Sequence, residues 1–302
     1  MAVISMKRAY LELISCVIFW GASFASMRMA VLELHPLTAV WFRVVFGLAV
    51  LAGIIFYRRE FSMPKARELA PLLFLGLMGV VFHQDIQFAA MRTAGVANAN
   101  WLIAATPSLI AVLGWVFLKE RLQPQAIIGL VISGLGVLLV VGLGTKGIGM
   151  FQANSFGDLL IFISALNWAV FQIVSRKLVQ DRTPAFTAFW MNVFAAIAQT
   201  SLFLFYPPEI SQIASMSPSC WFAVLFLGCI CSGLCYTFWY DGLSVMPAAK
   251  VAAFQFLQPV VGVVLAYFTA GERFTPYLFA GGAMIIAGVW MVNKDKRKAE
   301  AK

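Results

Sequence analysis

The stretch TPSLIAVLGWVFLKERLQPQAIIGLVISGLGV, residues 106–137, decides the fold because it occurs twice. Six of its residues recur, identical and in the same order, 152 positions later in the chain. The pairs are Pro107 and Pro259, Glu120 and Glu272, Arg121 and Arg273, Pro124 and Pro276, Gly129 and Gly281, and Gly136 and Gly288. Such agreement in one register indicates an internal duplication rather than chance.

The duplication extends toward the N-terminus with a small change of register. A shift of 148 positions places Trp20 on Trp168, Arg28 on Arg176 and Pro36 on Pro184. The sequence therefore predicts a first repeat over 10–145, a linker over 146–156, a second repeat over 157–293 and a basic tail over 294–302.

Composition indicates a protein that lies within a membrane. Hydrophobic residues make up 62% of the chain and charged residues 12%, against roughly half and a quarter in soluble domains. Apolar runs near 20 residues long read as transmembrane helices. Ten are expected, over 11–31, 37–57, 69–90, 95–118, 124–143, 157–177, 185–206, 219–240, 248–270 and 276–293. The expected fold is an all-α integral membrane protein.

The distribution of basic residues predicts how the chain is oriented. Of the 22 Lys and Arg residues, 17 fall on the side that holds the N-terminus, four on the other side, and Arg43 within a helix. This bias predicts that both termini are cytoplasmic. Because each repeat has an odd number of helices, the second enters the membrane upside down. Inverted repeats of this kind are typical of secondary transporters, with the substrate site near the midplane.

These motifs carry a family resemblance that covers nearly the whole chain. Trp20-Gly21, Pro107, and Glu120-Arg121 followed by Gly129 and Gly136, all echoed in the second repeat, resemble the EamA family of the drug/metabolite transporter superfamily. The resemblance implies a ten-helix exporter of amino acids or similar small metabolites in the bacterial inner membrane. It also implies a cavity lined by helices 1–4 and 6–9. The second repeat departs from the first where Gly21 becomes Ala169 and Arg43 becomes Met191.

Two charged residues inside the membrane predict an ion pair. Arg43 lies about 9 Å below the external surface at 1.5 Å per helical residue, and Asp85 lies at a similar depth in the next helix. A charge at that depth is costly unless it is paired or faces water. The alternative for Arg43 is that its side chain extends outward to the interface.

Polar and aromatic residues near the midplane are the candidate substrate site. They are Trp20, His83, Gln87, Trp101, Asn167, Trp168, Gln172, Gln255 and Gln258. The side chain of histidine ordinarily titrates near neutral pH, as proton coupling requires, so His83 is a candidate proton carrier; the alternative is an imidazole held by a neighbouring helix. Trp20 and Trp168 are expected to pack together or to line a cavity, whereas Trp239 and Tyr240 are expected near a helix end, in the interfacial belt.

Two prolines predict helix breaks at matching positions of the repeats. Pro107 and Pro259 each remove a backbone donor from a predicted membrane helix. Such a break survives only where protein or a wet cavity satisfies the freed carbonyl. Paired breaks of this kind indicate a binding site.

Several function classes are disfavoured by absent motifs. The chain has no phosphate loop, and neither His-Glu-x-x-His nor Gly-x-Ser-x-Gly occurs. The five cysteines lack a histidine at metal-ligand spacing, so neither metal nor cofactor is expected. The net charge of +9 is explained by a basic cytoplasmic face, without nucleic acid. The expected partners are a small-molecule substrate, the lipid bilayer and, through His83, protons; the chain is compatible with a monomer or a homodimer.

The leading interpretation is therefore a secondary exporter. An efflux transporter for drugs or organic cations is the first alternative, and it would use Asp85 if Arg43 leaves that carboxylate free. A membrane-embedded enzyme is a weaker alternative, and a receptor or scaffold is the third.

Overall fold

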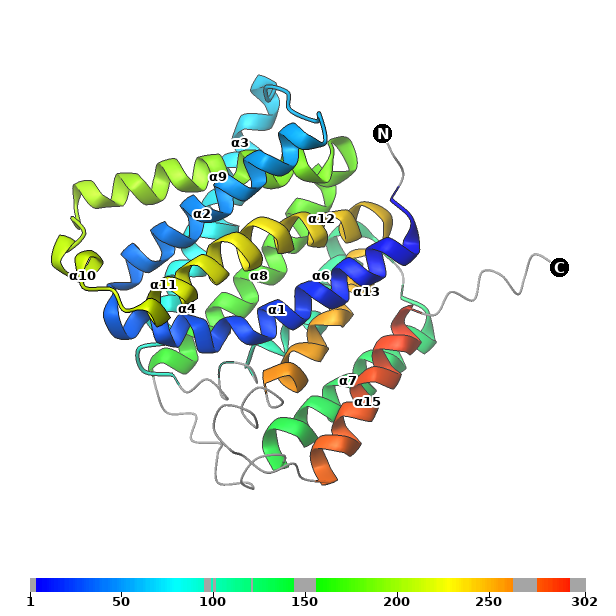
Figure 1. Ribbon diagram of the computed structural model, residues 1–302. Helices are drawn as coiled ribbons and strands as arrows, with labels where there is room; N and C mark the ends of the chain where they lie inside the picture. The colour runs from blue at the N-terminus through cyan, green and yellow to red at the C-terminus, as the bar shows by residue number, and fades with distance from the viewer. Residues whose placement is uncertain are drawn as a thin grey trace.

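The computed structural model describes residues 4–94, 99, 102–120, 122–143, 156–262 and 276–293. Within these ranges every regular element is helical (Figure 1), which confirms the expected all-α class. Six helical segments are long and apolar enough to cross a membrane. They are Met6–Glu33, Pro36–Tyr57, Ala66–Ala90, Leu159–Arg176, Pro184–Leu204 and Pro218–Val245.

The first half of the described chain begins with two long helices, α1 (Met6–Glu33) and α2 (Pro36–Tyr57). The third span has three parts, α3 (Ala66–Gly76), the π-helix η1 (Leu77–Phe82) and α4 (His83–Ala90). Two shorter apolar helices follow, α6 (Thr106–Leu118) and α7 (Pro124–Leu143).

The second half also has two long helices before a span that contains a π-helix. It contains α8 (Phe156–Asp181), α9 (Pro184–Ser201), the 3-10 turn η3 (Leu202–Leu204), α10 (Ile210–Ala214), α11 (Pro218–Leu225), the π-helix η4 (Phe226–Leu234), α12 (Cys235–Val245), α13 (Ala248–Ala253), the 3-10 turn η5 (Phe254–Leu257) and α15 (Pro276–Asn293). The expected linker and basic tail fall mostly outside the described residues.

Local sequence explains where several helices begin. The Thr183 side chain accepts a hydrogen bond from the Phe186 amide at the start of α9, and Ser217 accepts one from Cys220 at the start of α11. In each case proline follows the capping residue, where its missing N–H costs nothing. These Thr-Pro and Ser-Pro pairs set the helix starts within a residue of the predicted positions.

Two spans contain π-helical segments that the apolar pattern did not predict. The segments expected as regular helices over 69–90 and 219–240 contain η1 and η4 in their middle. Glycines beside them allow close approach: a Cβ at Gly76 would lie 2.6 Å from the Met191 carbonyl, and one at Gly228 only 2.5 Å from the Phe46 Cβ. π-helical segments are rare and occur frequently at functional sites.

The sequence predicted Pro107 in the middle of a helix, but Pro107 lies at the start of one. The helix α6 begins at Thr106, and residues 104–105 form a turn before it. Pro259 has the same relation to its neighbours, because the 3-10 turn η5 ends at Leu257 and α-helix resumes at Gln258. The interruptions exist at both places, but they precede the prolines, since proline is tolerated in the first turn.

Helices α7 and α15 lie side by side at one edge of the bundle (Figure 1). A Cβ at Gly129 would meet the Gly288 carbonyl at 2.6 Å, and one at Gly136 would meet the Gly281 carbonyl at 2.7 Å. Close backbone contact at small residues is the usual basis of helix packing in membranes.

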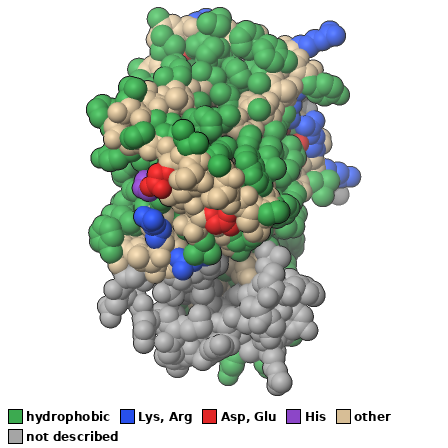
Figure 2. All heavy atoms as spheres, turned by 60° about the vertical axis from the view of Figure 1, so that its left-hand side comes forward, with side chains coloured by type: hydrophobic (Ala, Val, Ile, Leu, Met, Phe, Trp, Pro, Cys, Tyr) green, Lys and Arg blue, Asp and Glu red, His purple; other side chains and the backbone are tan. Residues whose placement is uncertain are grey.

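The outer surface is largely apolar, as a lipid-facing surface requires. Figure 2 shows a face covered mainly by hydrophobic side chains, with charged groups gathered in small patches. Large hydrophobic side chains that are more than half exposed include Leu11, Leu32, Val131, Phe117 and Phe222. A water-soluble protein rarely exposes so much continuous apolar surface.

Ion pairs join the ends of several helices. Arg58 donates two hydrogen bonds to Asp241 at 3.2 and 3.0 Å, and Arg182 donates two to Glu68 at 2.7 and 2.9 Å. Glu120 accepts a 3.1 Å hydrogen bond from the Ala248 amide at the start of α13 and lies 3.6 Å from Arg176.

Candidate functional site

A polar cavity lies in the middle of the helix bundle. Its walls come from α1, α2, α4, α8, α12, the segment around Ile103, η5 and the first residue after η5. The cavity volume is about 50 Å³, room for a few water molecules at the roughly 10–15 Å³ that each water centre needs. The lining residues are Trp20, Ser23, Phe24, Arg43, His83, Gln84, Gln87, Ile103, Trp168, Tyr236, Gln255 and Gln258.

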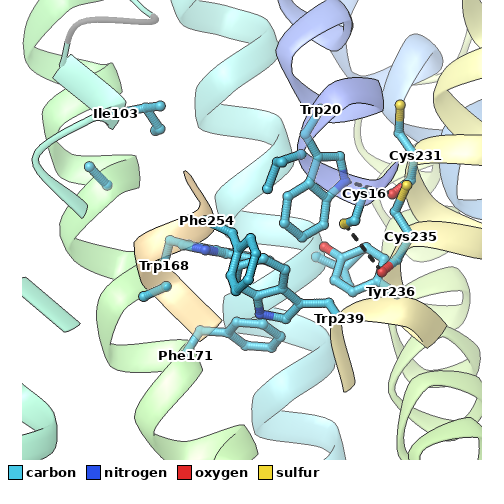
Figure 3. Packing of buried hydrophobic residues seen from close by; sticks show 14 of the residues in the cluster. Cys16, Trp20, Ile103, Trp168, Phe171, Cys231, Cys235, Tyr236, Trp239 and Phe254 are labelled. Carbon is cyan, nitrogen blue, oxygen red and sulfur yellow. Dashed lines mark hydrogen bonds between the residues drawn. The ribbon is translucent and has the colours of Figure 1, made fainter. Parts of the chain in front are cut away.

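Aromatic rings form one wall of the cavity (Figure 3). The rings of Trp20 and Trp168 meet edge to face, with centroids 5.6 Å apart and planes at 86°. Trp20 also packs on Trp239 at 4.9 Å, and its indole N–H donates to the Cys231 carbonyl at 2.9 Å. Trp168 stacks on Phe171 at 4.9 Å. The two indoles thus both pack together and line the cavity, as the sequence predicted.

The His83 imidazole is held by two residues of α8. Its Nδ1 lies 2.9 Å from the Ser164 hydroxyl, and its ring stacks on Trp168 with centroids 4.8 Å apart. Ser164 is fully buried and does not line the cavity. The serine therefore orients the imidazole and is not placed to meet a solute.

Tyr236 connects the cavity wall to the π-helix η1. Its hydroxyl donates to the Gly79 carbonyl at 3.1 Å and accepts from Gln84 Nε2 at 3.4 Å. Asn167 Nδ2 donates to the Met78 carbonyl, also in η1, at 2.8 Å. These bonds tie the side chains of Tyr236 and Asn167 to carbonyls of η1, and they hold Gln84 in place next to His83.

Four buried polar atoms on the lining side chains have no hydrogen-bond partner within the described part of the chain. Two are donors, Arg43 Nη1 and Trp168 Nε1, and two are acceptors, Gln84 Oε1 and Gln255 Oε1. Buried polar groups are rarely left without a hydrogen bond, so we expect each of these atoms to bond to a water or a ligand. A solute with an acceptor end and a donor end would satisfy both kinds.

Arg43 and Asp85 do not form the ion pair that the sequence predicted. Arg43 Nε donates to Ser232 Oγ at 2.8 Å, and Asp85 Oδ1 accepts from Gln199 Nε2 at 3.0 Å. Their helices turn the two side chains toward different neighbours. Depth can be counted along a helix, whereas the direction of a side chain around the helix depends on packing.

Of the nine predicted substrate residues, eight are described; six of these line the cavity and two do not. Trp20, His83, Gln87, Trp168, Gln255 and Gln258 are brought together. Asn167 points to η1, and Gln172 lies one turn beyond Trp168, buried outside the cavity with 1% of its surface exposed. Trp101 lies outside the described residues.

Sequence reasoning missed Ser23, Phe24, Gln84, Ile103 and Tyr236 as lining residues, and assigned Arg43 another role. Gln84 was recognisable as part of the polar run beside His83. Trp239 and Tyr240 were wrongly expected in the interfacial belt. Both are fully buried, because α12 continues to Val245 and places them more than a turn inside the helix end.

The lining residues of the cavity are of kinds that can bind a solute. Among the described residues, no three His, Cys, Asp or Glu side chains converge as metal ligands would. No acidic side chain is among the lining residues. The lining residues include one cation, several amides, an imidazole and aromatic rings.

Comparison with known proteins matches the chain to one family of transporters. The model of the EamA-like transporter family matches residues 7–142 and 155–294. An uncharacterized transporter of Archaeoglobus fulgidus is 27% identical over 97% of this chain and 99% of its own length. The uncharacterized transporter YyaM of Bacillus subtilis is 26% identical over 93% of this chain and 92% of its own.

One relative has a more specific name, and one solved structure supports the fold. A probable terminal-alkyne amino-acid exporter of Streptantibioticus cattleyicolor is 25% identical over 96% of this chain and 94% of its own. A crystal structure that is 21% identical superposes with a TM-score of 0.76 and covers 98% of this chain and 100% of its own. At that identity the structural likeness concerns the fold.

Proposed function

The chain belongs to the EamA-like transporter family, and on that basis we propose that it is a secondary transporter that exports small metabolites such as amino acids. The solute would pass through the central cavity by alternating access or facilitated exchange. The observation that carries the proposal is the contact of Trp20 with its counterpart Trp168 at the wall of that cavity.

Contacts between equivalent residues support an architecture of two inverted repeats. When two units are related by a two-fold axis, residues on the axis touch their own counterparts. Trp20 touches Trp168 at the 148-residue register, and Gln84 bonds to Tyr236 at the 152-residue register. Ser133 donates to the carbonyl of Ile285, its counterpart at the same 152-residue separation.

Reciprocal contacts away from the axis support the same architecture. Gly129 approaches Gly288, and Gly136 approaches Gly281; exchanging each residue for its counterpart turns one contact into the other. The pairing also runs α7 against α15 in opposite directions, as an axis in the membrane plane requires. We propose ten transmembrane helices arranged in this way, with the substrate site on the axis.

The unsatisfied atoms of the cavity favour a small amphipathic solute. A carboxylate can accept from Arg43 and Trp168, and an ammonium group can donate to the amide oxygens of Gln84 and Gln255. The indole faces of Trp20 and Trp168 suit an apolar side chain. An amino acid has all three parts, in keeping with the name of the Streptantibioticus relative. Since the cavity is small, a solute of that size requires the bundle to open further.

Organic cations are the weaker candidates. Efflux of a cation calls for a carboxylate in the cavity, and Asp85 is bonded to Gln199 and is not a lining residue. An enzyme is weaker still, because the only serine bonded to His83 in the described residues is Ser164, which lies outside the cavity. The imidazole shares its cavity with the Arg43 guanidinium. We therefore propose that His83 acts as a neutral hydrogen-bonding group.

We further propose that the protein lies in the bacterial inner membrane with both termini in the cytoplasm. The basic bias of the loops supports this orientation. Tyr10, near the start of α1, and Asn293, at the end of α15, line one shared groove, which supports placing both ends of the described chain on the same side (Figure 1).

A flux screen that also follows chemical change tests the proposal. Purified protein in liposomes is loaded with unlabelled solute, and uptake of labelled L-amino acids, nucleosides and organic cations is measured by counterflow. We expect amino acids to exchange and to be recovered unaltered. Exchange of organic cations alone would favour the drug-efflux alternative, and recovery of altered solute would favour an enzyme.

A further inference from the structure

We propose that Arg43 binds the anionic end of the transported solute, so that recognition in the central cavity requires a free carboxylate. This inference rests on the proposed function, because it specifies the class of solute that the same cavity accepts. It assigns to Arg43 a binding role in place of the structural ion pair that the sequence predicted.

The first observation is position. Arg43 is the eighth residue of α2 and only 4% exposed, yet it belongs to the lining of the cavity together with His83, Gln87 and Gln255. The side chain therefore does not extend outward to the membrane surface. Its charge is directed to the place where the solute is proposed to bind.

The second observation is the lack of a counter-ion. None of the ion pairs formed by described residues includes Arg43, and Asp85 is engaged by Gln199. The titratable groups that interact with it electrostatically are Cys231, Cys235, Tyr236 and His83. None of these is a carboxylate. A buried charge without a partner is strongly unfavourable, so an anion supplied by a ligand would relieve a cost built into the cavity.

The third observation is the state of the guanidinium itself. Nε is used by Ser232 at 2.8 Å, and the Cζ lies 5.9 Å from the centre of the Phe88 ring, which holds the group in place. Nη1 is buried and has no hydrogen-bond partner. A guanidinium presents its donors as a planar fork that matches a carboxylate, and it stays protonated in proteins.

The cavity offers different partners to the two ends of an amino acid. The carboxylate would meet a full charge, whereas the amine would meet the neutral amide oxygens of Gln84 and Gln255. Charge-assisted hydrogen bonds are roughly twice as strong as neutral ones. Met191 occupies the position in the second half that is equivalent to Arg43. The second half therefore supplies no cation at that position, and the solute has one preferred orientation.

Binding to the purified wild-type protein tests the inference without any mutation. The twenty L-amino acids are screened for an increase in the thermal unfolding midpoint, since a ligand that binds only the folded state stabilises it. The best ligand is then compared with its primary amide, which lacks the charge, and with its N-acetyl form, which keeps the carboxylate. We expect the amide to bind about 10- to 100-fold more weakly and the N-acetyl form to lose less.

Substitutions of Arg43 then ask whether the preference depends on this residue. Arg43→Met introduces the residue that the second half carries at the equivalent position, and it should abolish the discrimination between acid and amide. Arg43→Lys should keep part of it, since it retains the charge without the fork. Arg182→Gln is the matched control, because it also removes one cation but lies at the end of α8; its ratio of acid to amide affinity should equal that of the wild type.

Each outcome assigns failure to one proposal. If acid and amide bind and exchange equally well in the wild type, the transport function stands and the role of Arg43 is overturned. If chloride alone produces the stabilisation that depends on Arg43, the residue holds an inorganic ion and the inference is again overturned. If no solute in the flux screen exchanges through folded protein, the proposed function itself fails. Should Arg43→Met not fold, the comparison of acid and amide in the wild type still decides.

Discussion

Trp20 of α1 and Trp168 of α8 pack edge to face in the middle of the bundle, with ring centroids 5.6 Å apart and planes at 86°. The two residues occupy the same position in the two halves of the sequence. Their contact therefore lies where the halves meet, and the polar cavity lies beside it. A site at such a seam changes shape when one half moves against the other, which is what alternating access requires.

The first prediction concerns His83. His83→Gln keeps a polar group of similar reach, so we expect it to retain a large share of solute exchange, whereas His83→Ala should lose most of it. Ser164→Ala removes the bond that orients the ring and should weaken solute affinity by severalfold without abolishing exchange. Counterflow in liposomes measures all three.

Proton coupling is tested with the same variants. If His83 acts as a neutral group, a pH gradient should change exchange by the wild type and by His83→Gln to the same extent. Gradient-driven accumulation that the wild type shows and His83→Gln lacks would contradict this and make the imidazole a proton carrier.

The second prediction concerns the contact between α7 and α15. Gly136→Ala would place a Cβ 2.7 Å from the Gly281 carbonyl, and overpacking of this kind costs about 1–3 kcal/mol. Gly134, on the same helix, has open space at that position. Gly134→Ala is therefore the matched control and should be neutral or slightly stabilising. Thermal unfolding in detergent compares the two, and equal effects would contradict the packing described.

The third prediction concerns Glu120, which follows α6 and contacts the start of α13. Glu120→Ala removes the acceptor of the Ala248 amide and the partner of Arg176. We expect a loss of about 1–3 kcal/mol in the free energy of unfolding. Glu120→Gln keeps an acceptor and should lose less. An unchanged unfolding midpoint in Glu120→Ala would mean that the contact contributes no stability.

The same residue gives a dependence on pH. Burial raises the pKa of the Glu120 carboxyl above its ordinary value of 4.5, although the guanidinium of Arg176 opposes the shift. A carboxyl with a raised pKa in the folded state binds its proton more tightly there than in the unfolded chain. The stability of the wild type relative to Glu120→Gln should therefore increase as the pH falls from 7 toward 4.5. A relative decrease over that range would contradict the assignment.

Helix positions and much of the site could be predicted because both depend on distance along the chain. Six of the ten predicted spans correspond to helical segments long and apolar enough to cross a membrane. The duplicated register paired Trp20 with Trp168, and the two rings are in contact. His83 and Gln87 were expected on one face because they are four residues apart, and both line the cavity. Gln255 and Gln258 were expected as polar residues near the midplane, and both line the cavity.

The remainder depends on how helices are turned about their axes, which spacing does not reveal. Arg43 and Asp85 were expected at one depth and paired, but their side chains bond to Ser232 and Gln199 on two other helices. The π-helical segments η1 and η4 each shift the register of the residues that follow, and no sequence signature announced them. Gln172 shows the same limit. It shares a helix face with Trp168, but it lies one turn further along α8, outside the cavity.

The fourth prediction concerns orientation. A reporter fused after Lys302 should behave as cytoplasmic, and a tag inserted within residues 144–154 should be labelled from outside the cell. The two positions lie on opposite sides only if the second repeat crosses the membrane an odd number of times. Labelling of both sites from the same side would contradict the inverted arrangement.

The most direct test of the account is the effect of the Trp20–Trp168 contact on solute exchange. Trp168→Ala removes an indole that lines the cavity and contacts Trp20. Trp115→Ala is the control, because it removes an indole of α6 that is 62% exposed and lies outside the cavity. Counterflow of the best amino acid is measured in liposomes that contain equal amounts of each folded variant. The account predicts that Trp168→Ala loses at least nine-tenths of the exchange, on the order of a tenfold effect, and that Trp115→Ala exchanges like the wild type. Equal exchange by all three proteins would contradict transport through the cavity between the two halves.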